Sequence, residues 1–314
     1  MPVDLCRQCW FLTGPTAAGK TAVGIELARR IGAEIVSLDS MALYRGMDLG
    51  TAKPTAAERQ AVTHHLVDVI EPHEEYSLAQ YVEAAHRAVA EIASRGCEVL
   101  FVGGTPLYLK GLLRGIFDGP PADWPLRSRL AEEARRNPPG FLHERLAACD
   151  PAAAARLHPN DTRRMIRALE VFEKTGRPIS ELQQQFDQGR PAAECRVFVL
   201  DWPRAELYAR IDRRVERMFS ARLVDEVRRL LERPQPLSRT AGQALGYREV
   251  IEHLEGLRPL DATLELVQTH TRQFAKRQNT WFRSLSECRF TPVAEPLDPA
   301  ETARRILESG KPEQ

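Results

Sequence analysis

The residues best suited to chemistry lie near the N-terminus, in a glycine-rich segment that ends in lysine and threonine. Residues 14–21 read GPTAAGKT and satisfy the pattern G-x-x-x-x-G-K-[ST]. In such a loop, backbone N–H groups and the start of the next helix face phosphate oxygens. Lys20 reaches the terminal phosphate and Thr21 is suited to ligate Mg²⁺. The predicted diphosphate-binding residues are Gly14, Pro15, Thr16, Ala17, Ala18, Gly19, Lys20 and Thr21.

A phosphate loop of this kind lies between a strand and a helix. An apolar run at residues 8–13 precedes it, and residues 20–31 carry apolar side chains at helical spacing. Further strands are expected at 34–38, 66–70, 98–102 and 195–201, and a helix at 78–94. Strands that alternate with helices predict a parallel sheet with helices on both faces. The predicted fold class is therefore α/β, with a P-loop NTPase-like parallel sheet flanked by helices.

The strand signals stop after about residue 118, where prolines and glycines separate helical stretches. We expect an all-helical insertion domain over residues 118–194 and a core domain formed by residues 1–117 and 195–314. Helices are expected at 207–231, 246–254 and 262–285, followed by a weakly ordered tail that contains prolines.

A phosphate loop alone does not identify a reaction, because ATP, GTP and other diphosphates present the same oxygens. Two apolar strands are followed directly by an aspartate, Asp39 in one case and Asp201 in the other. Phosphotransferases and hydrolases usually hold their metal ion with an aspartate in this position. The strand at 98–102 instead runs into Gly-Gly-Thr at 103–105. We expect Asp39 at the sheet edge that also carries the phosphate loop. These residues leave open a kinase, a nucleotide-switched RNA-binding protein and a transferase that releases diphosphate.

The composition is that of an ordinary globular protein, with 314 residues, a net charge of +1 and 43% hydrophobic residues. No apolar run approaches the roughly 18 residues of a membrane span, and the N-terminus lacks the apolar core of a secretory signal. Scattered cysteines fit reduced thiols, so we expect a cytoplasmic protein that does not contact membranes. Only six of the 44 basic residues are lysines, and the predominant arginine is suited to phosphate contacts and base stacking.

Beyond the phosphate loop, a series of short segments matches one known family in order. The segments are 37–40 (SLDS), 44–48 (YRGMD), 50–54 (GTAKP), 64–68 (HHLVD), 76–77 (YS), 103–108 (GGTPLY), 161–171 (DTRRMIRALEV), 242–247 (GQALGY) and 271–283 (TRQFAKRQNTWFR). They resemble the tRNA dimethylallyltransferases, and the resemblance spans residues 11–283. It implies transfer of a dimethylallyl group from dimethylallyl diphosphate to the exocyclic amine of the adenine just 3′ of the anticodon. The implied cofactor is Mg²⁺, and we expect a monomer.

The chemistry of prenyl transfer is consistent with the residues taken alone. An allylic diphosphate ionises when charge on the departing diphosphate is stabilised, which a phosphate loop does. The attacking amine must lose a proton as the C–N bond forms, and Asp39 is the candidate acceptor. The resemblance gives Asp39 the same role and places Thr105 and Arg214 near the diphosphate. From helical periodicity alone, Arg214 belongs to a solvated arginine face.

An enzyme that modifies a base must splay it out of the RNA and hold the backbone with cations. The helix at 262–285 should place Val267, Phe274 and Trp281 on one face and its cations on another. The resemblance assigns the insertion to the anticodon stem-loop and places Gln243 close to the RNA. The expected tRNA-binding residues are Asp39, Ser40, Met41, Leu43, Tyr44, Gln243, Arg163, Arg164, Arg167, Arg272, Lys276 and Arg283.

Three positions depart from the family pattern. Ala18 replaces a common serine, which removes a hydroxyl from the loop but none of its backbone donors. Pro106 replaces a common glycine and has no N–H to donate. Arg222 stands where glycine is common, at the turn between two helices.

Overall fold

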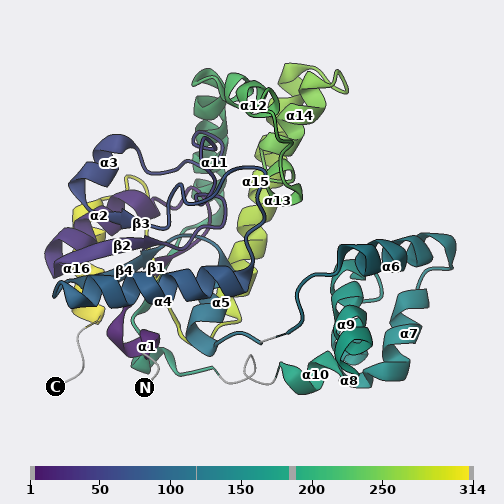
Figure 1. Ribbon diagram of the computed structural model, residues 1–314. Helices are drawn as coiled ribbons and strands as arrows, with labels where there is room; N and C mark the ends of the chain where they lie inside the picture. The colour runs from purple at the N-terminus through teal and green to yellow at the C-terminus, as the bar shows by residue number, and fades with distance from the viewer. Residues whose placement is uncertain (1–3, 118, 184–188, 311–314) are drawn as a thin grey trace. The chain divides into compact units, whose positions relative to one another are not determined.

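The chain folds into two compact units in a computed structural model that describes residues 4–117, 119–183 and 189–310 (Figure 1). The first unit comprises Met1–Leu113 and Gly189–Gln314, and the second comprises Arg114–Gln188. The domain boundaries expected from the sequence were residues 118 and 194. Among the described residues, no helix is long and apolar enough to cross a bilayer.

The first unit is built on a six-stranded parallel sheet with the strand order β3-β2-β4-β1-β5-β6. Its strands are β1 (Trp10–Thr13), β2 (Ala33–Ser37), β3 (His64–His65), β4 (Glu98–Val102), β5 (Val197–Asp201) and β6 (Cys288–Pro292). The three central strands are apolar along almost their whole length because helices cover both faces of the sheet. The predicted parallel α/β fold is confirmed.

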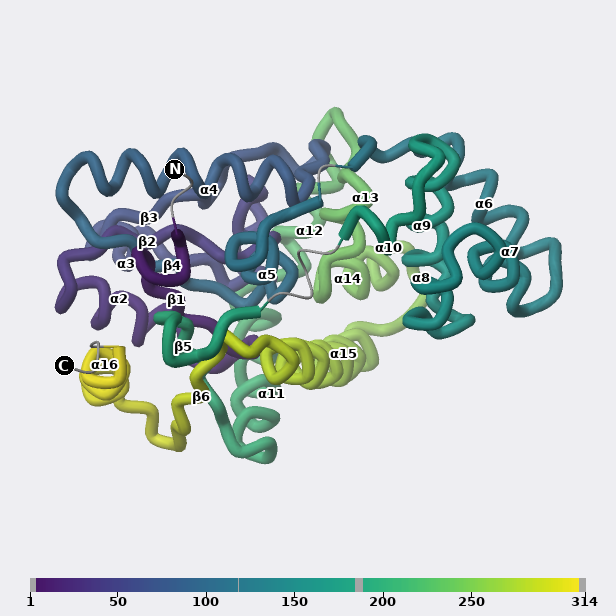
Figure 2. The backbone as a smooth tube through the Cα atoms, turned by 90° about the horizontal axis from the view of Figure 1, so that it is seen from below, coloured from purple at the N-terminus to yellow at the C-terminus, as the bar shows by residue number. Residues whose placement is uncertain are grey.

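Helices α4 and α5 lie on one side of the strands, and α2 and α16 lie on the other (Figure 2). The helices of this unit are α1 (Leu5–Gln8), α2 (Lys20–Ile31), α3 (Ala56–Ala61), α4 (Leu78–Ser94), α5 (Pro106–Arg114), α11 (Arg204–Ser220), α12 (Leu223–Leu231), α13 (Arg239–Gly242), α14 (Tyr247–Leu254), α15 (Leu260–Arg283) and α16 (Pro299–Ser309), with a short 3₁₀ helix at Ala192–Glu194. Helix α2 buries Val23, Leu27 and Ala28 against the sheet. The phosphate-loop segment therefore sits between a buried strand and a firmly packed helix.

The second unit consists of helices only, within the residues that the structure describes. They are α6 (Trp124–Arg136), α7 (Phe141–Cys149), α8 (Pro151–Arg156), α9 (Thr162–Thr175) and α10 (Ile179–Leu182). Leu130, Leu142, Leu146 and Leu169 form a separate small core, so this unit does not borrow core residues from the sheet.

The C-terminal segment and the third strand differ from expectation. The tail predicted to be weakly ordered contains β6 and α16. Asp298 caps the start of α16, and Pro299 lies in its first turn, where a missing N–H breaks no hydrogen bond of the helix. The strand predicted at 66–70 is instead β3 at 64–65, since Leu66 and Asp68 both adopt positive φ and leave the extended conformation.

The predicted helix 207–231 is divided in two at Arg222. This residue has a φ of 73°, in the left-handed region, and its guanidinium donates to Asp225 at 2.5 Å. An arginine therefore makes this turn in a conformation that ordinarily favours glycine. Pro106 begins α5, where a helix leaves its first N–H groups unpaired in any case.

Candidate active site

The phosphate loop connects β1 to α2 and is braced from outside by two side chains. Trp202 Nε1 donates to the Ala18 carbonyl at 3.0 Å, and Arg210 Nε donates to the Ala17 carbonyl at 2.9 Å. Ala17 and Gly19 adopt positive φ, and Gly19 caps the start of α2. The N–H groups of Thr16 and Ala18 are bonded within the protein, to Gln278 and to the Pro15 carbonyl, so the remaining N–H groups of the loop and of the first turn of α2 are the ones left to bind an anion.

The side chain of Lys20 lies over this loop, and its surroundings shift the pKa of its ammonium group. Its Nζ donates to the carbonyls of Gly14 at 3.0 Å and Pro15 at 2.7 Å. Burial is the main reason that the pKa of the ammonium is lowered to about 8. The carboxylate of Asp39 opposes this shift, and the positive charge of Arg214 adds to it. An anion placed here would restore the charged form.

Arg214 points into the site from α11 and does not belong to the solvated face that helical periodicity predicts for it. Its Nη1 donates to Thr16 Oγ1 at 3.2 Å and its Nη2 to the Thr51 carbonyl at 3.5 Å. Burial lowers the pKa of this guanidinium to about 10, and Asp39 opposes that shift as well. Lys20, Arg214 and Asp39 thus form one charge cluster at the sheet edge.

Asp39 and Thr105 follow the neighbouring strands β2 and β4 and are held close together. Thr105 donates its backbone N–H to the Leu38 carbonyl at 3.1 Å, and its hydroxyl oxygen accepts the Ser40 N–H at 3.0 Å. Asp39 Oδ1 accepts the Met41 N–H at 2.8 Å. The second carboxylate oxygen has no hydrogen-bond partner among the described residues. Asp39 is therefore oriented by one oxygen and retains the other for a ligand.

The approach of these two strand ends requires glycine at position 103. A Cβ there would lie 2.2 Å from the carbonyl carbon of Leu38, closer than any side chain tolerates. The Gly103 carbonyl in turn accepts the Thr13 hydroxyl at 2.8 Å. The Gly-Gly-Thr sequence that ends β4 is thus needed to bring Thr105 beside the β2 end.

Two tyrosine rings form a wall near Asp39. Tyr81 from α4 and Tyr108 from α5 are stacked with ring centroids 3.8 Å apart. Burial raises the pKa of both phenols, and the charge of Asp39 adds to each shift. The Tyr81 hydroxyl donates to the Ser37 carbonyl at 2.9 Å. Tyr81 is 0% exposed and Tyr108 5%, so the pair is packed within the core of this unit.

Gln278 was missed as a site residue by sequence reasoning, which treated its helix as an RNA-contacting element. It is 4% exposed on α15 and reaches both the phosphate loop and the β4–α5 connection. The face predicted for α15 is wrong at Phe274, which is 38% exposed, because the buried face carries Thr271, Ala275 and Gln278 instead.

The segment after Asp39 is folded inward. Leu43 and Tyr44, expected to contact RNA, are 0% and 1% exposed, so their side chains face the core, whereas Ser40 and Met41 are partly exposed. The buried Lys53 holds the segment from below by donating to the Tyr44 carbonyl at 2.7 Å.

A buried carboxylate fixes the same segment from the other side. Glu226 on α12 accepts the N–H groups of Asp48 at 3.2 Å and Leu49 at 2.8 Å, and the Tyr247 hydroxyl at 2.6 Å. A Cβ on Gly50 would lie 2.4 Å from the Tyr247 ring. These contacts position the segment whose Thr51 carbonyl accepts from Arg214.

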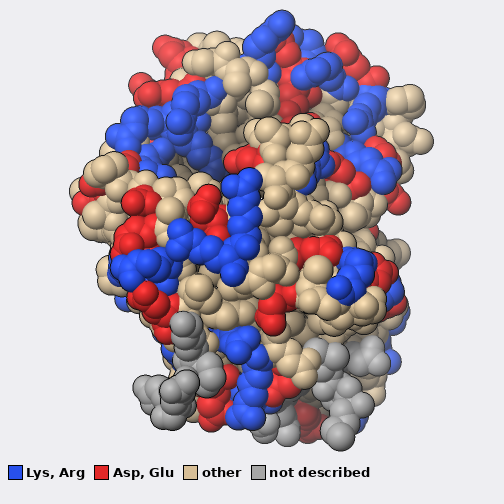
Figure 3. Space-filling model, turned by 90° about the vertical axis from the view of Figure 1, so that its left-hand side faces the viewer, with Lys and Arg blue, Asp and Glu red and all other residues tan. Residues whose placement is uncertain are grey.

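The basic side chains predicted on α15 differ in whether they already form an ion pair. Arg272 pairs with Asp212 at 2.5 Å and Arg283 with Asp201 at 3.0 Å, whereas Lys276 is exposed, as is Gln243 after α13. On the face drawn in Figure 3, groups of basic and of acidic side chains lie next to one another. Asp201, one of the two aspartates that could hold a metal ion in a kinase, is thus paired with Arg283, whereas the other, Asp39, lies beside the phosphate loop.

In the second unit the three predicted arginines behave differently from one another. Arg167 pairs with Glu170, a fully buried carboxylate that Arg127 also contacts at 2.8 Å. Arg164 pairs with Asp161 at 3.3 Å. Arg163 is exposed and has no ion-pair partner in the described ranges. Arg167 therefore supports the fold of this unit, and Arg163 has the charge most available to a ligand.

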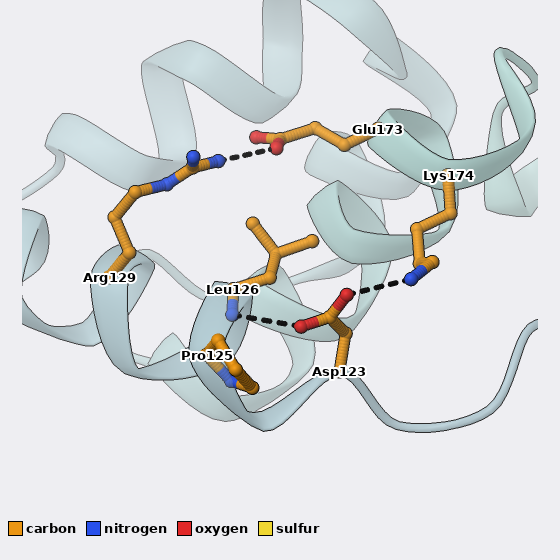
Figure 4. Close-up of a pocket in the computed structure, with 6 residues that line it drawn as sticks. All are labelled: Asp123, Pro125, Leu126, Arg129, Glu173 and Lys174. Atoms are coloured by element: carbon orange, nitrogen blue, oxygen red, sulfur yellow. Dashed lines mark hydrogen bonds and ion pairs between the residues drawn. The ribbon is translucent and has the colours of Figure 1, made fainter.

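A pocket of about 550 Å³ lies between α6 and α9 (Figure 4). Two of its cations are already neutralised, since Lys174 pairs with Asp123 at 2.7 Å and Arg129 with Glu173 at 2.6 Å. The pocket thus lacks the uncompensated positive charge that the phosphate loop has.

Comparison with known proteins agrees with this geometry. Residues 42–285 match the family model described as IPP transferase. The chain is 48% identical over 286 residues to the tRNA dimethylallyltransferase of Rhodopirellula baltica, with 88% of this chain and 86% of that protein covered. It is 43% identical to the tRNA dimethylallyltransferase of Pelotomaculum thermopropionicum over 94% of each chain.

Solved structures agree as well. The tRNA isopentenylpyrophosphate transferase of Bacillus halodurans superposes with a TM-score of 0.68 at 35% identity and 97% coverage of both chains. A eukaryotic dimethylallyltransferase acting on tRNA gives a TM-score of 0.71 at 25% identity, covering 91% of this chain and 74% of the other.

Proposed function

The chain belongs to the IPP transferase family of tRNA dimethylallyltransferases, and we propose that its phosphate-loop site takes the prenyl group from dimethylallyl diphosphate. It is a transferase that modifies tRNA. The proposed acceptor is the exocyclic amine of the adenine just 3′ of the anticodon. The kinase alternative is not favoured.

In the proposed reaction the C–O bond between the allyl carbon and the diphosphate breaks and a C–N bond to adenine forms. Negative charge grows on the departing diphosphate, where Lys20, Arg214 and the N–H groups of the loop stabilise it. The amine proton passes to the free oxygen of Asp39.

Thr21 is the residue proposed to hold Mg²⁺ with the diphosphate. It is half-buried on the first turn of α2, and its hydroxyl has no hydrogen-bond partner in the part of the chain that the structure describes. Within those residues no cluster of three or more His, Cys, Asp or Glu side chains is arranged to hold a metal ion. A hydroxyl together with phosphate oxygens fits the preference of Mg²⁺ for oxygen ligands, and the bound ion would neutralise charge on the leaving group.

The observation that carries the proposal is the set of contacts that joins the phosphate loop to the end of β2. Arg214 and Gln278 both contact Thr16 in the loop, and Gln278 also holds Gly104. The next residue, Thr105, accepts the N–H of Ser40 beside Asp39. A leaving group held by the cations and an amine beside the carboxylate would therefore meet in one place. Transfer of a prenyl group requires that juxtaposition, whereas a site for phosphate binding alone does not.

The experiment is incubation of the purified chain with unmodified tRNA and radiolabelled dimethylallyl diphosphate, followed by mapping of the labelled nucleoside. We expect label on one adenine next to the anticodon. The matched control is Asp201→Asn beside Asp39→Asn, because both residues lie at ends of parallel strands and only Asp39 belongs to the charge cluster. Consumption of ATP without labelling of tRNA, or an equal loss of activity in both variants, would contradict the proposal.

A further inference from the structure

Gln278 connects two parts of the site that are far apart in the chain. Its Oε1 accepts the backbone N–H of Thr16 at 2.9 Å, and its Nε2 donates to the Gly104 carbonyl at 2.5 Å. Thr16 lies in the phosphate loop, and Gly104 directly precedes Thr105. A single planar amide therefore sets the spacing between the diphosphate-binding loop and the residue beside Asp39.

The polarity of this amide is determined by its partners. Thr16 offers a donor and Gly104 an acceptor, so only an uncharged amide, with its oxygen and nitrogen in this order, satisfies both. A carboxylate at this position would still accept from Thr16 but would face the Gly104 oxygen without a proton. Gln278→Glu is therefore a severe change despite its similar shape.

The absence of a side chain at Gly104 leaves the space that the Gln278 amide occupies. A Cβ at this position would lie 2.8 Å from Gln278 Nε2, 3.2 Å from the Gly14 oxygen and 3.3 Å from Lys20 Nζ. The absence of a side chain at 104 thus allows the amide, the loop and the lysine to meet.

Thr16 is where two helices reach the phosphate loop. Gln278 on α15 holds its backbone N–H, and Arg214 on α11 donates to its hydroxyl at 3.2 Å. The two helices also pack along each other and are joined by the Arg272–Asp212 pair. Loss of Gln278 would free the loop from α15 while leaving its contact with α11.

We propose that Gln278 is a positioning residue for the transfer reaction, which holds the phosphate loop and Thr105 at the spacing that the prenyl diphosphate requires. The proposal rests on the proposed function of the site. Gln278 acts through Thr16 and Gly104 and contacts no reacting atom. Its loss should therefore affect binding of the diphosphate and the transfer step, and leave tRNA affinity unchanged.

The test compares Gln278→Ala with Gln273→Ala, an exposed glutamine on the same helix. For Gln278→Ala we expect the KM for dimethylallyl diphosphate and the dissociation constant for inorganic pyrophosphate with Mg²⁺ to rise about tenfold, the effect of losing roughly one well-made hydrogen bond to the loop. The KM for tRNA should stay within about twofold. Gln273→Ala should match the wild type.

A role in stability alone would give a different pattern, because partial unfolding lowers the amount of active enzyme and therefore kcat, with both KM values unchanged. That pattern would overturn the proposal. If the wild type neither prenylates tRNA nor binds pyrophosphate, the proposed function fails. If the wild type does both, and Gln278→Ala has the same KM and dissociation constants as the wild type, only the role of Gln278 fails.

Two measurements keep the proposal testable if Gln278→Ala does not fold. Amide exchange at Thr16 in the ligand-free wild type should be slow, because its N–H is hydrogen-bonded to a buried side chain, and fast exchange would refute the contact. In Gln278→Leu, whose side chain ends one atom short of Nε2, Gly104→Ala should cost less pyrophosphate affinity than in the wild type, since the 2.8 Å contact with Nε2 is gone. Equal costs would refute the match between the two positions.

Discussion

Titration of Lys20 should make diphosphate binding depend on pH. Burial lowers the pKa of its ammonium to about 8, so the free enzyme loses this charge as the pH rises through 8. A bound diphosphate stabilises the charged form, and affinity should therefore fall above pH 8. Between pH 7 and pH 9 the charged fraction falls from about nine-tenths to about one-tenth, which predicts a roughly tenfold weaker complex, or about 1.4 kcal/mol.

The assay is calorimetric titration with inorganic pyrophosphate and Mg²⁺ at several pH values, in the wild type and in Lys20→Arg. Arginine stays charged throughout this range, so the ratio of the two dissociation constants cancels the titration of the ligand itself. We expect that ratio to change about tenfold between pH 7 and pH 9. In Asp39→Asn, which removes the charge that opposes the shift, the midpoint should move below pH 8. Parallel curves for the wild type and Lys20→Arg would refute the reasoning.

Four other variants test separate parts of the site. Asp39→Ala should lower single-turnover prenylation about a hundredfold or more and leave tRNA affinity nearly intact, and full activity would remove it from the mechanism. Lys276→Ala should weaken tRNA binding and flatten the dependence of that binding on salt. An unchanged salt slope would assign Lys276 to an ordinary solvated face. Arg272→Ala should have the same effects and also lower the melting temperature of the protein, because it breaks the pair with Asp212. Glu226→Ala should cost about 2–3 kcal/mol in urea denaturation because it leaves buried N–H groups unpaired, and a cost below about 0.5 kcal/mol would contradict that role.

The parts of the site that were predictable from the sequence are local in the chain. The phosphate loop is defined by glycines and a lysine within eight residues, and Asp39 follows directly from an apolar strand. The edge of a parallel sheet then brings Asp39 to the loop without further information. The fold class was predictable for the same reason, since strands and helices alternate along the sequence.

Gln278 was beyond this kind of reasoning because its partners are 262 and 174 residues away. Nothing in the local pattern distinguishes a glutamine that bridges two loops from one that faces water. Arg214 shows the converse difficulty, since its helix has an apolar stripe and periodicity assigns every other position to solvent. The phosphate loop comes close enough to that second face to bury an arginine, which only the tertiary structure reveals.

The arrangement of charges explains why one carboxylate belongs among two cations. With no substrate present, Asp39 partly compensates the buried charges of Lys20 and Arg214 and makes their desolvation less costly. A diphosphate takes over that compensation when it binds, because it brings more negative charge to the same cations. The same anion favours the charged form of Lys20, whose pKa is lowered to about 8 chiefly by burial. Binding of the leaving group should thus complete the charge of Lys20, which predicts that pyrophosphate, without any prenyl chain, promotes proton uptake at Lys20 near pH 8.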